Sequence, residues 1–214
     1  MRIENWGLIP YREAWERQKS IFNTLIADRE SEEIVAACEH PAVYTLGVHG
    51  NESNLLLTPA PGVEVVRIER GGDITYHGPG QLVVYPLIDL NRHKLGVKKY
   101  VELLERSVRE TLADYGISTT SNDSQIGVWL DWDTPRARKI CAIGVKISHG
   151  VTMHGLALNV NTDMSAFRLI NPCGITDKLV TSMALELGHE LCWEDVARNL
   201  SNKIYLNLNS KLQV

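Results

Sequence analysis

Two apolar segments separated by only two residues constrain the fold more than any other feature of the sequence. KICAIGVKIS covers residues 139–148, VTMHGLALNV covers residues 151–160, and His149 and Gly150 lie between them. A short glycine-containing turn between two strand-like segments predicts a β-hairpin. The sheet of this protein should therefore be mixed or mainly antiparallel.

Helices and further strands are interleaved irregularly with this hairpin. Apolar residues at helical spacing predict helices over residues 11–30, 96–116 and 193–208, and Gly116 is well placed to end the second. Apolar runs bounded by turn residues predict further strands over residues 33–40, 42–47, 63–70, 81–90 and 127–130. No repeat or low-complexity linker divides the chain, so we predict one α+β domain over residues 1–214.

A glycine-rich stretch lies between two of the predicted strands. RGGDITYHGPGQ, residues 70–81, contains four glycines among charged and polar side chains. Glycine lets another molecule approach the backbone closely, so such a loop can present N–H groups to a ligand. Arg70 can pair with an anion, and His77 can transfer a proton near neutral pH. From these residues alone, a ligand-binding loop and a solvated hairpin loop both stay open.

The four cysteines are Cys38, Cys141, Cys173 and Cys192, and they form no CxxC pair, which argues against a zinc site built from cysteine pairs. Cys38 and Cys141 lie within strand segments and are predicted to pack in the core. Cys173 lies in NPCG, where the neighbouring proline and glycine predict a turn that a substrate can reach. A buried structural cysteine in a loop is the alternative interpretation.

A reactive thiol needs a nearby cation or base, and Lys139 and the histidines are the candidates. Lys139 begins a predicted strand and is a solvent-facing charge unless it points at a partly buried thiol. His154 has apolar neighbours on both sides and is predicted to be a structural residue with satisfied partners. His93 and His149 are expected to be solvated. Periodicity leaves the direction of the Lys139 side chain open.

Charge and hydropathy exclude several classes of partner. The net charge of −4 and the lack of a long basic run give no support for binding to nucleic acid. No segment approaches the ~20 apolar residues needed to span a bilayer, and the N-terminus does not resemble a signal peptide. We therefore expect a cytoplasmic protein that binds neither nucleic acid nor membranes.

Three stretches together resemble the lipoyl(octanoyl) transferases: RGGDITYHGPGQLVVYP, KICAIGVKISHGVTMHGLALNVN and INPCG. The resemblance extends over about residues 10–195 and implies the fold of the biotin and lipoate protein ligases, with a mixed sheet packed against helices. It implies transfer of an octanoyl group from octanoyl-acyl carrier protein to a lysine of a lipoyl domain, through a cysteine thioester. That reaction is the first step of endogenous lipoate biosynthesis.

The resemblance also implies roles for individual residues. Cys173 matches the acyl-thioester nucleophile and Lys139 the residue that activates it, while His154 is a candidate supporting residue. Arg70 and His77 would hold the mouth of the acyl pocket in place. The implied substrate-binding residues are Arg70, Gly71, Gly72, Asp73, Ile74, Thr75, Tyr76, His77, Ala142, Ile143, Gly144, Gly155, Leu156 and Ala157.

The implied reaction needs no cofactor and no metal, because conversion of a thioester to an amide is downhill without ATP. The implied acceptors are the lipoyl domains of 2-oxoacid dehydrogenase complexes and the glycine cleavage system H protein. One alternative is an ATP-dependent lipoate or biotin ligase of the same fold, in which Cys173 has no role. The others are a transferase with another acceptor, a thioester hydrolase, and a non-catalytic module that binds an acylated carrier.

Overall fold

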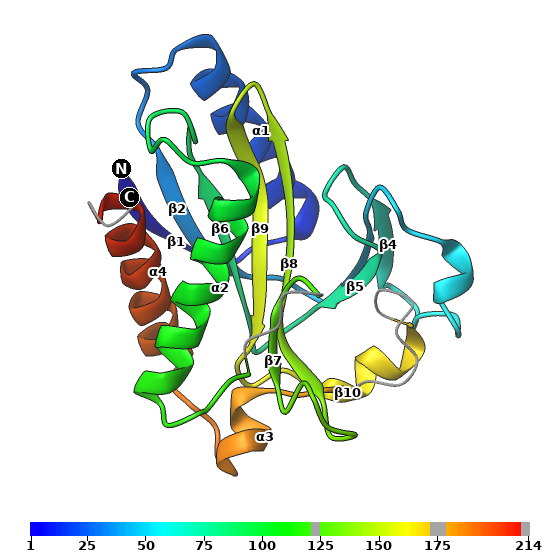
Figure 1. Cartoon of the computed structure of the whole chain (residues 1–214). Coiled ribbons are helices and arrows are strands. Elements are labelled where there is room, and N and C mark those ends of the chain that lie inside the picture. The colour runs from blue at the N-terminus through cyan, green and yellow to red at the C-terminus, as the bar shows by residue number, and fades with distance from the viewer. Residues whose placement is uncertain (121–124, 172–178, 211–214) are drawn as a thin grey trace.

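The computed structural model describes residues 1–120, 125–171 and 179–210 (Figure 1). A large mixed sheet has the strand order β1-β2-β6-β9-β8-β10, and β7 pairs with β8. Neighbouring strands of this sheet are antiparallel except for the β1–β2 and β8–β10 pairs. The strands are β1 (Arg2–Leu8), β2 (Ile34–Glu39), β6 (Gln81–Leu87), β7 (Val128–Leu130), β8 (Arg138–Ser148), β9 (Val151–Asn159) and β10 (Leu179–Val180).

The predicted hairpin is confirmed and forms the longest strand pair of the large sheet. Its two strands, β8 and β9, pair from Cys141 opposite Leu158 to Ser148 opposite Val151. The turn residues His149 and Gly150 have φ angles of 53° and 82°. Two consecutive residues with positive φ are what a tight hairpin turn requires, because this backbone matches the twist of the flanking strands.

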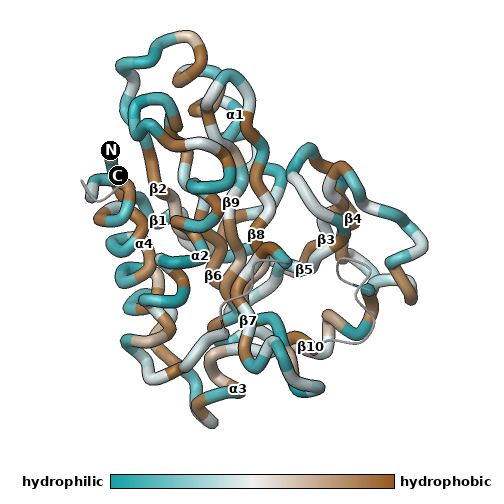
Figure 2. Tube along the Cα trace, in the orientation of Figure 1, coloured by the Kyte–Doolittle hydropathy of each residue, from teal (hydrophilic) through white to brown (hydrophobic). Residues whose placement is uncertain are grey.

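Three long helices cover the two faces of the large sheet (Figure 1). α1 (Tyr11–Ala27) packs on one face, and α2 (Val97–Asp114) and α4 (Trp193–Asn209) pack on the other, with the short α3 (Met183–Leu187) before α4. Figure 2 shows α4 alternating between hydrophilic and hydrophobic residues, as an amphipathic helix should. Among the described residues, no helix combines the length and the apolar character needed to cross a membrane.

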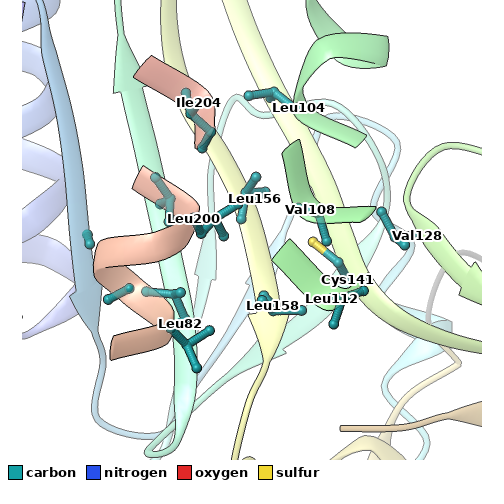
Figure 3. Packing of buried hydrophobic residues seen from close by; sticks show 14 of the residues in the cluster. Leu82, Leu104, Val108, Leu112, Val128, Cys141, Leu156, Leu158, Leu200 and Ile204 are labelled. Carbon is teal, nitrogen blue, oxygen red and sulfur yellow. The ribbon is translucent and has the colours of Figure 1, made fainter. Parts of the chain in front are cut away.

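The core between α2, α4 and the sheet contains apolar residues at helical spacing from both helices. Tyr100, Leu104, Val108 and Leu112 of α2 are fully buried, as are Val196, Leu200 and Ile204 of α4. Figure 3 shows several of these side chains around Leu156 and Leu158 of β9. Cys141 lies in the same cluster, and Cys38 lies in the core under α1, so both are packing residues as predicted. Burial raises the pKa of both thiols.

A second sheet of three strands, in the order β4-β3-β5, lies beside the large one (Figure 1). Its strands are β3 (Val43–Leu46), β4 (Glu64–Arg67) and β5 (Ile74–His77). β5 corrects the prediction that residues 70–81 form only a loop, because it pairs with β3 along its whole length. The four residues of β5 are too few for alternation to be recognised, although Ile74 and Tyr76 are both buried.

The sequence patterns also fail to predict β1 at the edge of the large sheet. Most of β1 is exposed or half-buried, so its residues show no apolar alternation. It pairs in parallel with β2, with an irregularity in register between Asn5 and Gly7. An exposed edge strand is held mainly by backbone hydrogen bonds. These bonds do not require particular side chains, so they leave no pattern in the sequence.

Candidate active site

One cavity of about 430 Å³ brings together most of the predicted site residues. Lys139, His154 and every predicted substrate-binding residue except Tyr76 line it. Tyr76 points elsewhere, since its ring packs against Tyr44 and Phe167 at centroid distances of 5.2 and 5.5 Å. Cys173 lies outside the described residues.

The start of the glycine-rich segment packs directly against β8. The Gly71 N–H donates to the Val145 carbonyl at 3.0 Å. A Cβ on Gly144 would lie 2.9 Å from the Gly71 oxygen and 3.1 Å from Arg70 Cδ, so a larger residue there would push the segment away. The close backbone approach that glycine allows is therefore to another strand of the protein, and the Gly71 N–H is occupied.

Arg70 and His77 are buried in the cavity wall, with 8% and 6% of their surfaces exposed. Arg70 Nη2 donates to the Thr45 carbonyl at 2.6 Å and holds the segment against β3. His77 Nδ1 lies 2.7 Å from Gln81 Oε1. Burial, with help from His40 and Arg70, lowers the pKa of His77 to about 3. The solvated-loop interpretation is therefore wrong for these two residues, and His77 is neutral at pH 7.

Lys139 lies where β8 meets both β7 and β10. Its Nζ lies 4.6 Å from the centroid of the Trp129 ring, within the range of a cation–π interaction. Gly127, with φ 116°, is also close to the lysine: a Cβ there would lie 3.3 Å from Lys139 Cε and 2.6 Å from the Cys141 oxygen. Trp129 and Gly127 thus pack against the Lys139 side chain. The sequence did not predict these contacts, because nothing in GVWL distinguishes residues that contact a site lysine from residues of the core.

His154 contradicts the prediction that its partners are satisfied. It is 2% exposed, and neither ring nitrogen has a hydrogen-bond partner among the described residues. Its backbone has φ 62° in the middle of β9, a conformation that costs a non-glycine residue about 1–2 kcal/mol. Burial lowers the pKa of His154 to about 3, so the ring is neutral at pH 7.

The other two histidines considered for a solvated role differ from each other. His149 is exposed in the hairpin turn, as predicted. His93 is not solvated, since its side chain is 11% exposed and its Nε2 lies 2.9 Å from Glu33 Oε2. The Glu33 carboxylate raises the pKa of His93. This contact lies outside the cavity and holds the chain after β6 against Glu33.

Further polar residues line the cavity that sequence reasoning did not select. Gln81 and Asn159 lie opposite each other in the β6–β9 pair, and Gln81 Nε2 donates to Asn159 Oδ1 at 2.9 Å. Tyr11 of α1 stacks on His77 with a centroid distance of 5.8 Å. Tyr85 has its hydroxyl 2.7 Å from His40 Nε2. These residues are far apart in sequence, so no local pattern could have grouped them.

The sequence matches the family described as the lipoyl protein ligase A/B catalytic domain over residues 10–205. It is 51% identical to an octanoyltransferase of Bacteroides thetaiotaomicron over 219 residues, which cover 99% of this chain and 96% of that protein. This chain belongs to the octanoyltransferase family. An octanoyltransferase of Christiangramia forsetii is 45% identical over 94% of this chain and 92% of its own length. The resemblance drawn from the three motifs is confirmed, and this octanoyltransferase is an acyltransferase.

Solved structures share the fold of this octanoyltransferase at low sequence identity. The bipartite lipoate protein ligase of Thermoplasma acidophilum matches with a TM-score of 0.69 at 14% identity, over 97% of this chain and 83% of that one. A lipoate-protein ligase A bound with ATP matches with a TM-score of 0.62 at 14% identity, over 97% and 84%. The predicted α+β fold of the biotin and lipoate ligases is therefore confirmed.

Proposed function

We propose that this enzyme transfers an octanoyl group from acylated acyl carrier protein to a lysine of a lipoyl domain, as the first step of endogenous lipoate biosynthesis. The observation that carries the proposal is a single cavity with Lys139 and an apolar wall that includes Val83, Ile143, Leu156 and Ala157. Each buried CH₂ contributes ~0.8 kcal/mol, so an eight-carbon chain would gain ~5 kcal/mol in such a cavity.

The acceptor is supported by two relatives in fold. The Thermoplasma acidophilum ligase was solved in a study of its E2 lipoyl domain, and other relatives are named lipoate ligases. Lipoyl domains of 2-oxoacid dehydrogenase complexes and the glycine cleavage system H protein are therefore the proposed acceptors.

Cys173 is the proposed nucleophile, and the other cysteines support it by elimination. Cys38 and Cys141 are buried packing residues with raised pKa values, which disfavour the reactive thiolate. Cys192 is exposed at the start of α4 and does not line the cavity. Cys173 lies in the INPCG motif, and β10, which begins six residues later in the sequence, pairs with β8 at Lys139.

Two acyl transfers would complete the reaction. The Cys173 thiolate attacks the thioester carbonyl of the donor, the carrier thiolate leaves, and the octanoyl group is held on Cys173. The amine of the acceptor lysine then attacks this second thioester, Cys173 leaves as a thiolate, and an amide forms. Lys139 would accept the Cys173 proton, pass it to the departing carrier thiolate, and later accept the proton released by the amine.

The function is tested by mixing the enzyme with octanoyl-acyl carrier protein and a lipoyl domain in the absence of ATP. Intact-mass analysis should show an octanoyl amide on the lipoyl domain, and added ATP should not change the rate. An absolute requirement for ATP would instead identify a ligase. Release of octanoate without amide would identify a hydrolase, and binding without turnover a carrier-binding module, and either result refutes the proposal.

Trp129→Leu should slow the acylation of Cys173, because the Lys139 ammonium loses its cation–π contact with the indole ring. A cation–π contact contributes ~0.5–2 kcal/mol, which corresponds to a loss of about 2–30-fold. The rate of acyl-enzyme formation in a single turnover measures it. Trp129→Phe keeps an aromatic face and should retain most of the rate. Equal losses in both variants, together with equal drops in Tm, would reduce Trp129 to a packing residue.

A further inference from the structure

His154 is a buried polar residue of the cavity lining, and neither of its ring nitrogens has a hydrogen-bond partner in the part of the chain that the structure describes. A regular strand would place it on the same face as Leu156, in the core under α2 and α4. Its positive φ interrupts this alternation, and the ring lies instead close enough to Glu69, Arg70 and Lys146 for their charges to act on it. The strained backbone therefore serves to aim an imidazole into the cavity.

The cavity extends beyond the reach of an octanoyl chain. One end of the cavity is at Lys139, and the other is at His154, which pairs with Val145 of β8. Val145 is six residues from Lys139, so the two ends are about 20 Å apart at ~3.3 Å per residue. An extended chain advances ~3.3–3.6 Å per three bonds, so the seven carbon–carbon bonds of octanoyl span about 8 Å. Between these ends lie Ala142 to Gly144 and Gly155 to Ala157, which all line the same cavity.

The unpaired nitrogens at the His154 end of the cavity favour a bound hydroxyl group. A neutral imidazole presents one N–H donor and one acceptor nitrogen, and both are unpartnered in His154 among the described residues. A hydroxyl or a water molecule can satisfy either or both of them. A hydrocarbon chain that displaced water from this end would leave both nitrogens unpaired, which is unfavourable.

We propose that the His154 end of the cavity is a hydroxyl-binding subsite, which favours long acyl chains that end in a hydroxyl and disfavours unsubstituted chains long enough to reach it. Water occupies the subsite when an octanoyl chain is bound. The inference rests on the proposed function, since it requires that the acyl chain enters from the Lys139 end. Chain length is then limited by desolvation of His154 in addition to any steric stop.

The test compares octanoyl, tetradecanoyl and hexadecanoyl carrier thioesters with their ω-hydroxy counterparts. For the wild-type enzyme, kcat/KM should favour the hydroxylated chain over the unsubstituted chain by about tenfold at fourteen or sixteen carbons, where the chain is long enough to approach His154. His154→Phe, which keeps a planar ring without polar atoms, should abolish this preference. If His154→Phe does not fold, His154→Gly removes the ring at a position whose φ suits glycine, and should abolish it too.

His149→Phe is the matched control, because His149 also has positive φ but lies exposed in the turn, and it should leave the preference unchanged. Thermal shifts with hexadecanoate and 16-hydroxyhexadecanoate measure the same preference without turnover. Absence of octanoyl transfer by the wild type would overturn the proposed function, while the thermal shifts would still decide this inference. A wild-type enzyme without hydroxyl preference, or one whose preference survives loss of the imidazole, overturns the subsite.

Discussion

Cys173→Ala should abolish octanoyl transfer, with a loss of about 10⁴-fold or more, because no other group would replace the thiolate as the acyl carrier. The acyl-enzyme should also disappear: intact-mass analysis of wild type mixed with octanoyl-acyl carrier protein should show a covalent octanoyl adduct, and the variant should show none. Tm should change little if the side chain acts in chemistry and not in packing.

Cys192→Ala is the matched control, since this thiol is exposed and does not line the cavity. It should retain both the adduct and the turnover. Substantial transfer by Cys173→Ala would refute the nucleophile. Turnover by the wild type without any detectable adduct would favour direct transfer between the two carriers and would remove the two-step scheme.

Lys139→Met should slow acylation by about 10²–10³-fold, because proton transfer by a positioned side chain contributes on this scale. Methionine keeps the unbranched stem of lysine but has no charge and no basic nitrogen. A cation beside a thiol favours the thiolate, so its removal should make the thiol harder to ionise. The acid limb of the acylation profile should therefore move to higher pH, and the measurement is the single-turnover rate across pH 5–10.

Lys98→Met is the control for the loss of one positive charge, because the Lys98 side chain is 92% exposed on α2 and lies 3.8 Å from Glu102. Its profile should match the wild type. A Lys139→Met enzyme with an unchanged pH profile would show that Lys139 does not act on the thiol. A reduced rate with an unchanged profile would then point to a role in binding the donor.

Local sequence patterns were sufficient for the hairpin, the three long helices and the stripes of apolar residues that they bury. These features depend on contacts between residues close in the chain, such as Leu104, Val108 and Leu112 on one face of α2. The motifs RGGDITYH and KICAIG also predicted which segments meet, and thirteen of the fourteen predicted substrate-binding residues line one cavity. The catalytic roles of Cys173 and Lys139, the substrate-binding roles of the cavity residues and the single domain over residues 1–214 stay predictions.

Only the tertiary structure decided the direction of individual side chains at the site. Tyr76 turns away from the cavity because β5 pairs with β3, and the support of Lys139 by Trp129 depends on the pairing of β7 with β8. His154 faces the cavity because its own φ is positive. A prediction from strand periodicity assumes that every residue has the negative φ of a regular strand. Apolar spacing thus determined most helices and strands of this protein, whereas pairing between distant segments determined β1, β5 and the surroundings of the site residues, because burial and partners exist only after the strands have met.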